Sequence, residues 1–399
     1  MTDEDMVSQI KQESTIKPPK GWEPFTEEVG AIGNAIVKLP RPSATEHDLL
    51  VQAGFDPDGW RISGPVNTRK WMNYDGDWLY YYKFDTVQGE APHVEQAHID
   101  ELTKLIRRRS FKRVPVPPGF DGRVLVGSDW QIGKREGDIG TDETVRRVLD
   151  VIEQEKREIK DLRRAGYAMP TGVFVGTGDL LEGTCGFYPN QQFLIDRNRR
   201  EQNRIVRELL THIIDELAPL YEFFHIATVG GNHGENRNDG SKVADDGDND
   251  DVGVFEAVKE AFDMASRYGA GPDNLTWQIP DDELSIAFDV AGVKIGAAHG
   301  HQFGIGATAQ QKAVNWWRGQ DFGFQVVRDS QILLTSHFHH PSEVTYGTRT
   351  HLQSGAMDPG SKWFTDRTGE AAPPSTLAFR VDPNDPLGFT HKRLLSPRS

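Results

Sequence analysis

The stretch that decides the fold runs from residue 124 to residue 131 and reads VLVGSDWQ. Its three apolar residues are typical of a short strand buried on both faces of a sheet. Asp129, whose carboxylate can ligate a metal, follows almost directly. In open α/β folds, ligands collect outside the carboxyl ends of the strands. This stretch therefore predicts a layered α/β domain with a functional side chain at a strand end.

The same arrangement recurs further along the chain, each time after or overlapping an apolar run. The later segments are Gly178-Asp179, Gly231-Asn232-His233, His299-Gly300-His301 and His337-Phe338-His339-His340. Six of the thirteen histidines fall in the last three segments, whereas surface histidines would scatter. Two cations about 3.5–4 Å apart neutralise a phosphate ester and activate a water, and carboxylate, imidazole and amide groups hold them. Together the segments indicate a two-metal phosphoesterase site.

In order and spacing, these segments resemble the motifs of calcineurin-like metallophosphoesterases. That family carries Asp-x-His, Gly-Asp, Gly-Asn-His, a lone His and Gly-His-x-His, and the similarity spans about residues 120 to 355. The resemblance implies that Asp179 bridges two metals. It implies one metal on Asp129 and His339, and the other on Asn232, His299 and His337. His233 is implied to be catalytic and not a ligand: it would protonate the leaving oxygen or steady the transition state, which suits an imidazole.

Gln131 departs from the family pattern, which has a histidine at this position of the first motif. As a predicted metal ligand it offers a carbonyl oxygen, which suits Mn²⁺ or Mg²⁺ better than Zn²⁺. We therefore expect the first metal to be weak, exchangeable or absent. The expected cofactors are two divalent ions, Mn²⁺ first, with Mg²⁺, Fe²⁺ or Zn²⁺ as alternatives. Glu182 either orients a ligand or a water, or begins a helix.

The order of elements predicts a layered α/β metallophosphoesterase sandwich, with mixed sheets flanked by helices and a small N-terminal α+β module. We expect a charged tail over residues 1–45, the module and a basic linker over 46–113, and the metallophosphoesterase domain over 114–399. In the module, a short helix follows Thr45 or Ser43 as N-cap, and Asp75-Gly76 joins two aromatic strands in a hairpin. Helices are expected over 141–164 with Thr141 as N-cap, 191–217 and 252–267, and further strands over 285–290, 293–297, 332–335 and 343–346.

Composition narrows the setting. The chain of 399 residues has a net charge of −15 and one cysteine, Cys185, so it has no intrachain disulfide and no cysteine-rich zinc site. No apolar run approaches the ~20 residues that span a bilayer, and we expect no signal peptide because residues 1–20 are polar and acidic. We expect a cytoplasmic protein. The basic runs 104–113 and 197–207 are solvated faces or contact nucleic acid. The acidic stretch 239–251 is a disordered insertion or a third cation-binding surface.

The motifs do not discriminate between substrates, so the identity of the substrate must be inferred from the residues around the metals. Residues 232–235 and 299–301 resemble most closely the Mre11/SbcD-type DNA-repair nucleases, and the N-terminal module resembles the leader of phage-encoded metallophosphoesterases. The first hypothesis is a DNA nuclease or exonuclease, in a bacterial host if phage-encoded. Trp316, Trp317 and Arg318 would stack on bases, unless the two tryptophans are helix core. The alternatives are a phosphodiesterase or phosphatase for a small molecule or phosphoprotein, and an inactive binding subunit. The expected partners are DNA and a homodimer or partner ATPase, with no membrane.

Overall fold

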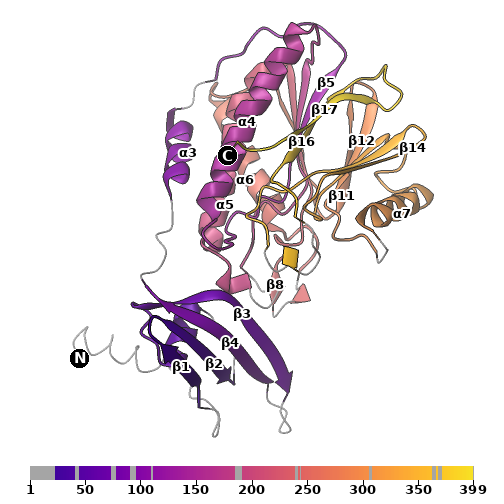
Figure 1. Cartoon of the computed structure of the whole chain (residues 1–399). Helices are drawn as coiled ribbons and strands as arrows, with labels where there is room; N and C mark the ends of the chain where they lie inside the picture. The colour runs from indigo at the N-terminus through magenta and orange to yellow at the C-terminus, as the bar shows by residue number, and fades with distance from the viewer. Residues whose placement is uncertain are drawn as a thin grey trace. The chain divides into compact units, whose positions relative to one another are not determined.

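The structure is a computed structural model that describes residues 23–40, 45–72, 78–89, 96–108, 111–184, 191–238, 241–242, 244–304, 308–361, 365–366 and 371–398. The chain divides into two compact units (Figure 1). The smaller comprises residues 1–94 and 188–195, and the larger comprises residues 95–187 and 196–399.

The smaller unit is a four-stranded antiparallel sheet with one helix packed on it. Its strands, in the order β1-β2-β4-β3, are β1 (Phe25–Val29), β2 (Ile32–Leu39), β4 (Trp78–Gln88) and β3 (Trp60–Met72), and the helix is α2 (Glu46–Ala53). The Thr45 side chain accepts a hydrogen bond from the Asp48 N–H, as expected of an N-cap. The predicted aromatic hairpin is confirmed, with Met72 opposite Trp78. Its turn, Asp75-Gly76, and the alternative cap, Ser43, lie outside the described residues.

The module begins earlier than the sequence predicts, because β1 and β2 fall in the stretch taken as a tail. In β2, Ala35, Val37 and Leu39 are buried and alternate with less buried residues, which is the pattern of a half-buried strand. This alternation is short, and the apolar Ile36 stands at one of the less buried positions, so the pattern reads weakly from sequence. The predicted basic linker also differs, since helix α3 (Ala97–Arg108) occupies much of it and belongs to the larger unit.

The larger unit contains two main sheets. The first has the order β10-β7-β6-β5-β16-β17, formed by β10 (Leu275–Gln278), β7 (Phe223–Thr228), β6 (Thr171–Gly176), β5 (Gly122–Gly127), β16 (Thr376–Val381) and β17 (Phe389–Leu395). The second has the order β11-β12-β13-β15-β14, formed by β11 (Ser285–Val290), β12 (Val293–Ala298), β13 (Ile332–Thr335), β15 (Arg349–Gln353) and β14 (Ser342–Tyr346). Strands β10, β7, β6 and β5 are parallel, as are β12, β13 and β15.

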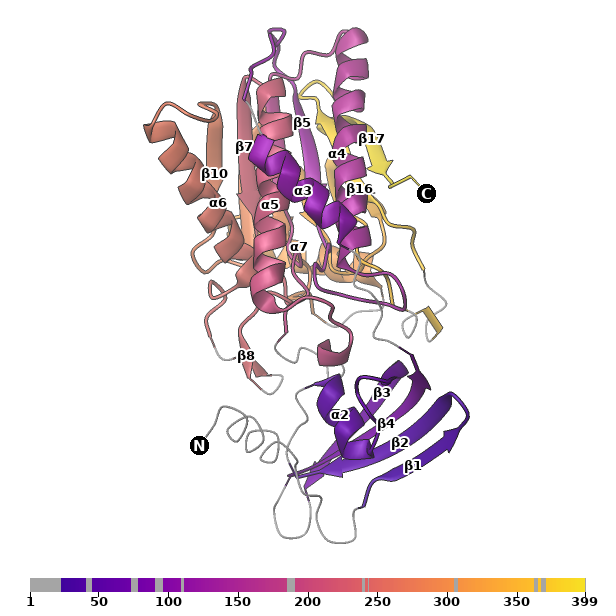
Figure 2. The ribbon, with the colours of Figure 1, turned by 90° about the vertical axis from the view of Figure 1, so that its left-hand side faces the viewer.

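Alternation along β5 shows how the layers form. Val124 and Val126 point into a core shared with residues of the second sheet, whereas Leu125 points into a core shared with helices. Those helices are α3, α4 (Thr141–Arg164), α5 (Arg199–Leu217) and α6 (Asp250–Arg267), and α3 crosses α4 and α5 in Figure 2. Helix α7 (Ala309–Phe322) packs against the second sheet: its Trp317 contacts Val327, which follows the helix, and Leu333 of β13. The predicted layered α/β sandwich is thus confirmed.

Two helix starts differ from the prediction. Gly140, not Thr141, is the N-cap of α4, and the Thr141 hydroxyl instead donates to the Asp196 carboxylate and accepts from the Gly133 N–H. Helix α5 begins at Arg199 rather than near residue 191, because Asn198 and Glu201 form a capping box there. Among the described helices, none is both long and apolar enough to cross a bilayer.

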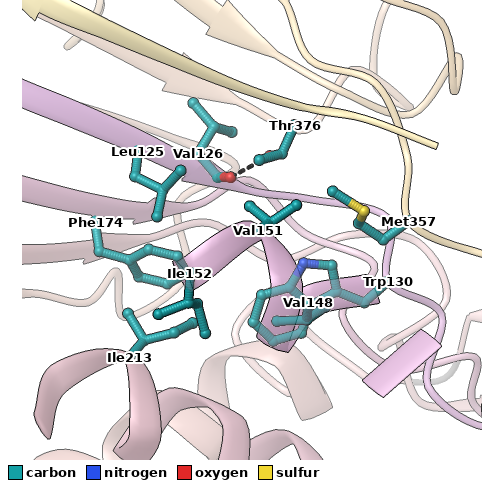
Figure 3. A pocket seen from close by; sticks show the side chains of 10 residues that line it. All are labelled: Leu125, Val126, Trp130, Val148, Val151, Ile152, Phe174, Ile213, Met357 and Thr376. Carbon is teal, nitrogen blue, oxygen red and sulfur yellow. Dashed lines mark hydrogen bonds between the residues drawn. The ribbon is translucent and has the colours of Figure 1, made fainter. Parts of the chain in front are cut away.

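The helix-side core holds a small cavity (Figure 3). It is lined by side chains from β5, β6, β16, α4 and α5, together with Trp130 and Met357. Its volume is about 10 Å³, at the lower limit for a single water, and its lining is almost wholly apolar. It is therefore a packing gap and not a ligand site. Trp130, the middle residue of the first motif, anchors that motif in this core.

Candidate metal centre

The predicted site segments meet where strands of both main sheets end. Asp129, Asp179 and Asn232 follow β5, β6 and β7 of the first sheet, and His299 and His337 follow β12 and β13 of the second. Five of the ten described non-glycine residues with positive φ belong to these segments: Asp129, Gln131, Asp179, His337 and His339. L-residues seldom adopt this conformation, and it persists where the surroundings enforce it, often at functional sites.

Two glycines allow these loops to approach closely. Gly178 has a φ of +90°, and a Cβ on it would lie 2.7 Å from the Gly231 nitrogen and from Nδ1 of His299. A Cβ on Gly231 would lie 2.1 Å from Oδ1 of Asp179. Both contacts are too short for a side-chain carbon, so the Gly-Asp and Gly-Asn-His motifs need their glycines for steric reasons.

Asp251, at the start of α6, holds two of the loops together. Its buried carboxylate accepts hydrogen bonds from the N–H groups of Asp179, Leu180 and Gly231, at 2.8 to 2.9 Å. Burial and the neighbouring Asp179 raise the pKa of Asp251. The sequence prediction of a disordered acidic insertion is wrong for this residue. An N-cap-like asparagine followed by two acids, residues 249–251, was the available signal for an ordered helix start.

Around Asp179, several electron-pair donors converge. Nε2 of His299 lies 3.0 Å from Oδ2 of Asp179 and 3.2 Å from Oδ1 of Asn232. Nδ1 of His299 donates to the Thr177 carbonyl at 2.7 Å, so a neutral His299 presents its Nε2 lone pair to those oxygens. Oδ2 of Asp179 is buried and accepts no hydrogen bond of ordinary geometry. Such a convergence requires a proton or a cation at its centre.

His337 completes this group. Ligand atoms of Asp179, His299 and His337 all lie within 4.8 Å of one another, which suits one metal ion. Burial, with the nearby His299, lowers the pKa of His337 to about 3, so its imidazole is neutral at pH 7. Burial also acts on His299, but Asp179 outweighs it and raises the pKa of His299 to about 9. We call Asp179, Asn232, His299 and His337 the metal side of the site. Their donor atoms fit a divalent cation.

His233 is placed beside the metal side. Its backbone N–H donates to Oδ1 of Asp179 at 2.8 Å. Its ring Nδ1 lies 3.0 Å from the Glu182 carbonyl oxygen and 3.2 Å from Oε2 of Glu182. Burial lowers the pKa of His233, but Glu182 and Asp179 outweigh it and raise the value to about 9. Glu182 therefore orients this imidazole, whereas the sequence analysis expected it to orient a metal ligand or a water, or to begin a helix. The Nε2 atom is 4.0 Å from Oδ2 of Asp179.

Lys134 and Asp358, which the sequence analysis did not single out, form the opposite side of the site. Nζ of Lys134 lies 2.5 Å from Oδ2 of Asp358 and 2.7 Å from Oε1 of Gln131, and both charged side chains are buried. Burial lowers the pKa of Lys134, but the Asp358 carboxylate outweighs it and holds the pKa above its usual value. We call Gln131, Lys134, His339, Asp358 and Asp129 the lysine side.

His339 joins the two carboxylates of the lysine side. Its Nε2 faces Oδ1 of Asp129 and its Nδ1 faces Oδ1 of Asp358, each at 3.4 Å. Burial lowers the pKa of His339, but Asp358 and Asp129 outweigh it and raise the value to about 10. Oδ1 of Asp129 is buried and accepts no hydrogen bond of ordinary geometry. Asp129 and His339 thus meet as predicted, although the carbonyl oxygen of Gln131 is turned to Lys134.

The remaining predicted residues lie further out. His301 lies near Glu235, with its Nε2 3.6 Å from Oε1, and His340 contacts the Phe338 carbonyl. Trp317 is buried and its indole N–H donates to the Val327 carbonyl. It is therefore a core residue of the helix, which was the alternative to base stacking. Trp316 is half-buried beside Phe303, and Arg318 lies over the Tyr346 ring. Substrate binding by Trp316, Trp317 and Arg318 stays a prediction, as does metal binding by Gln131.

No protein-family model and no curated protein sequence matches this chain. Among solved structures, it is similar to a predicted phosphoesterase from Streptococcus pneumoniae TIGR4 (14% identity, 66% of this chain, 84% of that chain, TM-score 0.28). It is also similar to Vps29 complexed with Zn²⁺ from Entamoeba histolytica (15% identity, 66% of this chain, 87% of that chain, TM-score 0.29). A third likeness is to the hypothetical protein PH1004 from Pyrococcus horikoshii OT3 (10%, 69%, 88%, 0.34). At such low identities and TM-scores these likenesses do not assign a function.

Proposed function

We propose that this chain is a metal-dependent phosphoesterase that hydrolyses phosphodiester bonds, with DNA as its substrate. One observation carries the proposal. Asp179, Asn232, His299 and His337 converge at the ends of strands from two sheets, with a buried carboxylate oxygen that accepts no ordinary hydrogen bond. Carboxylate, amide oxygen and imidazole together form a donor set for a hydrolytic divalent cation such as Mn²⁺, Fe²⁺ or Zn²⁺.

The residues of the chain divide the work. A divalent cation bound here would neutralise the phosphate and favour deprotonation of a bound water. His233 is held through its Nδ1 by Glu182, whose carboxylate favours the protonated imidazole. It is suited to donate that proton from Nε2 to the departing oxygen of the ester. Asp251 keeps the backbone of the Asp179 and Gly231 loops in place during this step.

The choice of DNA rests on the residues around the metal side. Residues 232–235 and 299–301 resemble the nuclease branch of metallophosphoesterases. Helix α7 follows the His299 segment and presents the half-buried Trp316 beside Phe303. An aromatic ring with a partly exposed face can stack on an unpaired base. A small phosphodiester is the competing substrate, and the assay below is designed to separate the two.

The test compares substrates on the purified full chain with Mn²⁺. Linear single- and double-stranded DNA, cyclic nucleotides, a phosphopeptide and bis-p-nitrophenyl phosphate are incubated with wild type and with Asp179→Asn. We expect cleavage of DNA and of the chromogenic diester by wild type alone. Rapid turnover of a small ester with DNA intact would overturn the choice of DNA. Equal rates for wild type and Asp179→Asn, or none with any substrate, would overturn the phosphoesterase proposal.

A further inference from the structure

A lysine contacts one of the residues that the resemblance implies as ligands of the first metal. The implied ligands of that metal are Asp129, Gln131 and His339, beside the bridging Asp179. In the structure, the Gln131 carbonyl oxygen lies 2.7 Å from Nζ of Lys134, so the one ligand atom that Gln131 could offer already binds a cation. The Gln131 amide nitrogen faces Nε2 of His233 at 3.2 Å.

Lys134 is fixed by a built network. Its Nζ is paired with Asp358 at 2.5 Å, and side chains of the pair are only 10% and 5% exposed. The N–H groups of Met357 and Asp358 both donate to the Asp129 carbonyl at 3.1 Å. Arg147 donates to the carbonyls of Met357 and Asp358 at 3.0 and 2.6 Å. The segment that carries Asp358 is thus tied to the first motif and to α4.

The charges of the lysine side are matched by groups that a metal would have to displace. Asp358 is paired with Lys134, and the Nδ1 of His339 faces the other oxygen of the same carboxylate at 3.4 Å. A charged lysine has three donors and no lone pair, so it cannot ligate a metal and repels one nearby. The residues of the metal side are one carboxylate, one amide and two imidazoles. Its cationic groups are imidazoles, which can lose their protons when a metal binds.

We infer that the Lys134 ammonium is the resident cation of the first metal position. The chain then binds one divalent ion tightly, on Asp179, Asn232, His299 and His337, and Lys134 replaces the charge of a second ion. Lys134 acts through Gln131 and Asp358, so it is a positioning residue that sets the metal stoichiometry. This inference concerns the same site as the proposed function and rests on it.

The experiment counts Mn²⁺ ions on the purified full chain. Equilibrium dialysis with elemental analysis gives the number bound, and electron paramagnetic resonance separates an isolated Mn²⁺ from an exchange-coupled pair. We expect one tightly bound ion per wild-type chain, with the spectrum of an isolated ion. Gln131→His should remain at one ion because the ammonium is still present. Lys134→Met combined with Gln131→His should gain a second ion and show a coupled spectrum.

Three controls make the count decisive. Lys134→Arg keeps the charge and should keep one ion, and Lys160→Met, on the exposed face of α4, should match wild type. Circular dichroism reports whether each variant is folded. If the double variant does not fold, wild type and Gln131→His decide. Two tight, coupled ions in wild type, a second ion in Gln131→His alone, or a folded double variant that stays at one ion would overturn the inference. Hydrolysis of diesters by a two-ion wild type would overturn the inference but leave the proposed function standing.

Discussion

The metal side and the lysine side of the site are built from similar residues but satisfy their charges differently. On the metal side, the Asp179 carboxylate faces the imidazole nitrogens of His299 at 3.0 Å and His233 at 4.0 Å. On the lysine side, Asp358 is paired with Lys134 at 2.5 Å, and His339 lies between Asp358 and Asp129. Each side combines at least one buried carboxylate with one half-buried histidine, His337 or His339, so burial alone does not distinguish them.

The difference lies in the kind of cation that each side contains. An imidazolium loses its proton within the accessible pH range, whereas a lysine paired with a carboxylate keeps its charge. A metal can therefore replace a proton on the metal side without leaving a carboxylate unpaired. On the lysine side the same replacement would bring a metal close to a permanent positive charge. Two halves of one cluster can thus serve different ends, one binding an exchangeable ion and the other holding the loops in place.

The largest expected effect is the loss of hydrolysis when the metal side loses its carboxylate. Asp179→Asn removes the negative charge on which the proposed ion depends, and we expect at least ~10³-fold slower cleavage of bis-p-nitrophenyl phosphate with Mn²⁺. Asp129→Asn is the matched change on the lysine side, and we expect a smaller loss, about 10-fold. Steady-state rates at saturating Mn²⁺ measure both. Equal losses in the two variants would show that the two sides do not differ in function.

His233→Ala should slow the reaction by roughly 10²–10³-fold, because it removes the proposed proton donor but no ligand. Mn²⁺ affinity, measured by titration calorimetry, should stay close to that of wild type. Glu182→Gln is the control, since it replaces the carboxylate that raises the pKa of His233 with a neutral amide and leaves the imidazole ring in place. It should move the alkaline limb of the pH–rate profile to lower pH. A His233→Ala variant that no longer binds Mn²⁺ would instead make His233 a ligand.

Next in size is the stability of the lysine side. Lys134→Met leaves Asp358 buried beside His339 without its ammonium, and breaking a buried ion pair in this way costs about 3 kcal/mol or more. Asp179→Asn should cost much less, because it removes a buried charge from a cluster that lacks a permanent cation. Urea unfolding without metal gives the free energies of both variants. A loss in Asp179→Asn as large as that in Lys134→Met would contradict the contrast between the two sides.

The strand ends could be predicted because each is a local pattern. An apolar run such as residues 124–126, followed by Asp129, is visible without knowledge of any other part of the chain. Asp179, Asn232, His299 and His337 were identified in the same way, and the structure brings them together. The early strand β2 was missed because its alternation of buried residues is short and two of its less buried positions, Ile32 and Ile36, are apolar.

The supporting residues could not be predicted because their partners are distant in sequence. Lys134 and Asp358 are 224 positions apart. Asp251 is 72 positions from Asp179, whose N–H donates a hydrogen bond to its carboxylate. No periodicity or spacing links such pairs, and an aspartate in a charged stretch is most often exposed. The packing of β6, β7 and α6 brings Asp251 to the Asp179 loop, and hydrogen bonds from the Met357 and Asp358 N–H groups to the Asp129 carbonyl bring Asp358 to Lys134. The sequence therefore indicated the candidate ligands more fully than the groups that set their charges.

The smallest effect tests whether carboxylates, rather than burial, raise the histidine pKa values on both sides. His351 of β15 is fully buried, as His299 is. Among the described residues it hydrogen-bonds to Thr335 alone and no carboxylate acts on its pKa, which burial lowers to about 4. Its folded-state pKa lies below the unfolded value of about 6.5, so the unfolded chain binds the proton more readily. The stability that the neutral imidazole allows is complete above pH 6.5 and falls as the pH drops toward 4. Between pH 7 and pH 5 this amounts to about 2 kcal/mol. His351→Gln keeps a partner for Thr335 but cannot titrate, so urea unfolding at both pH values should show a correspondingly shallower loss than in wild type. Parallel losses in the two proteins would mean that burial does not lower the pKa of His351, and the contrast with His299 and His339 would lose its reference.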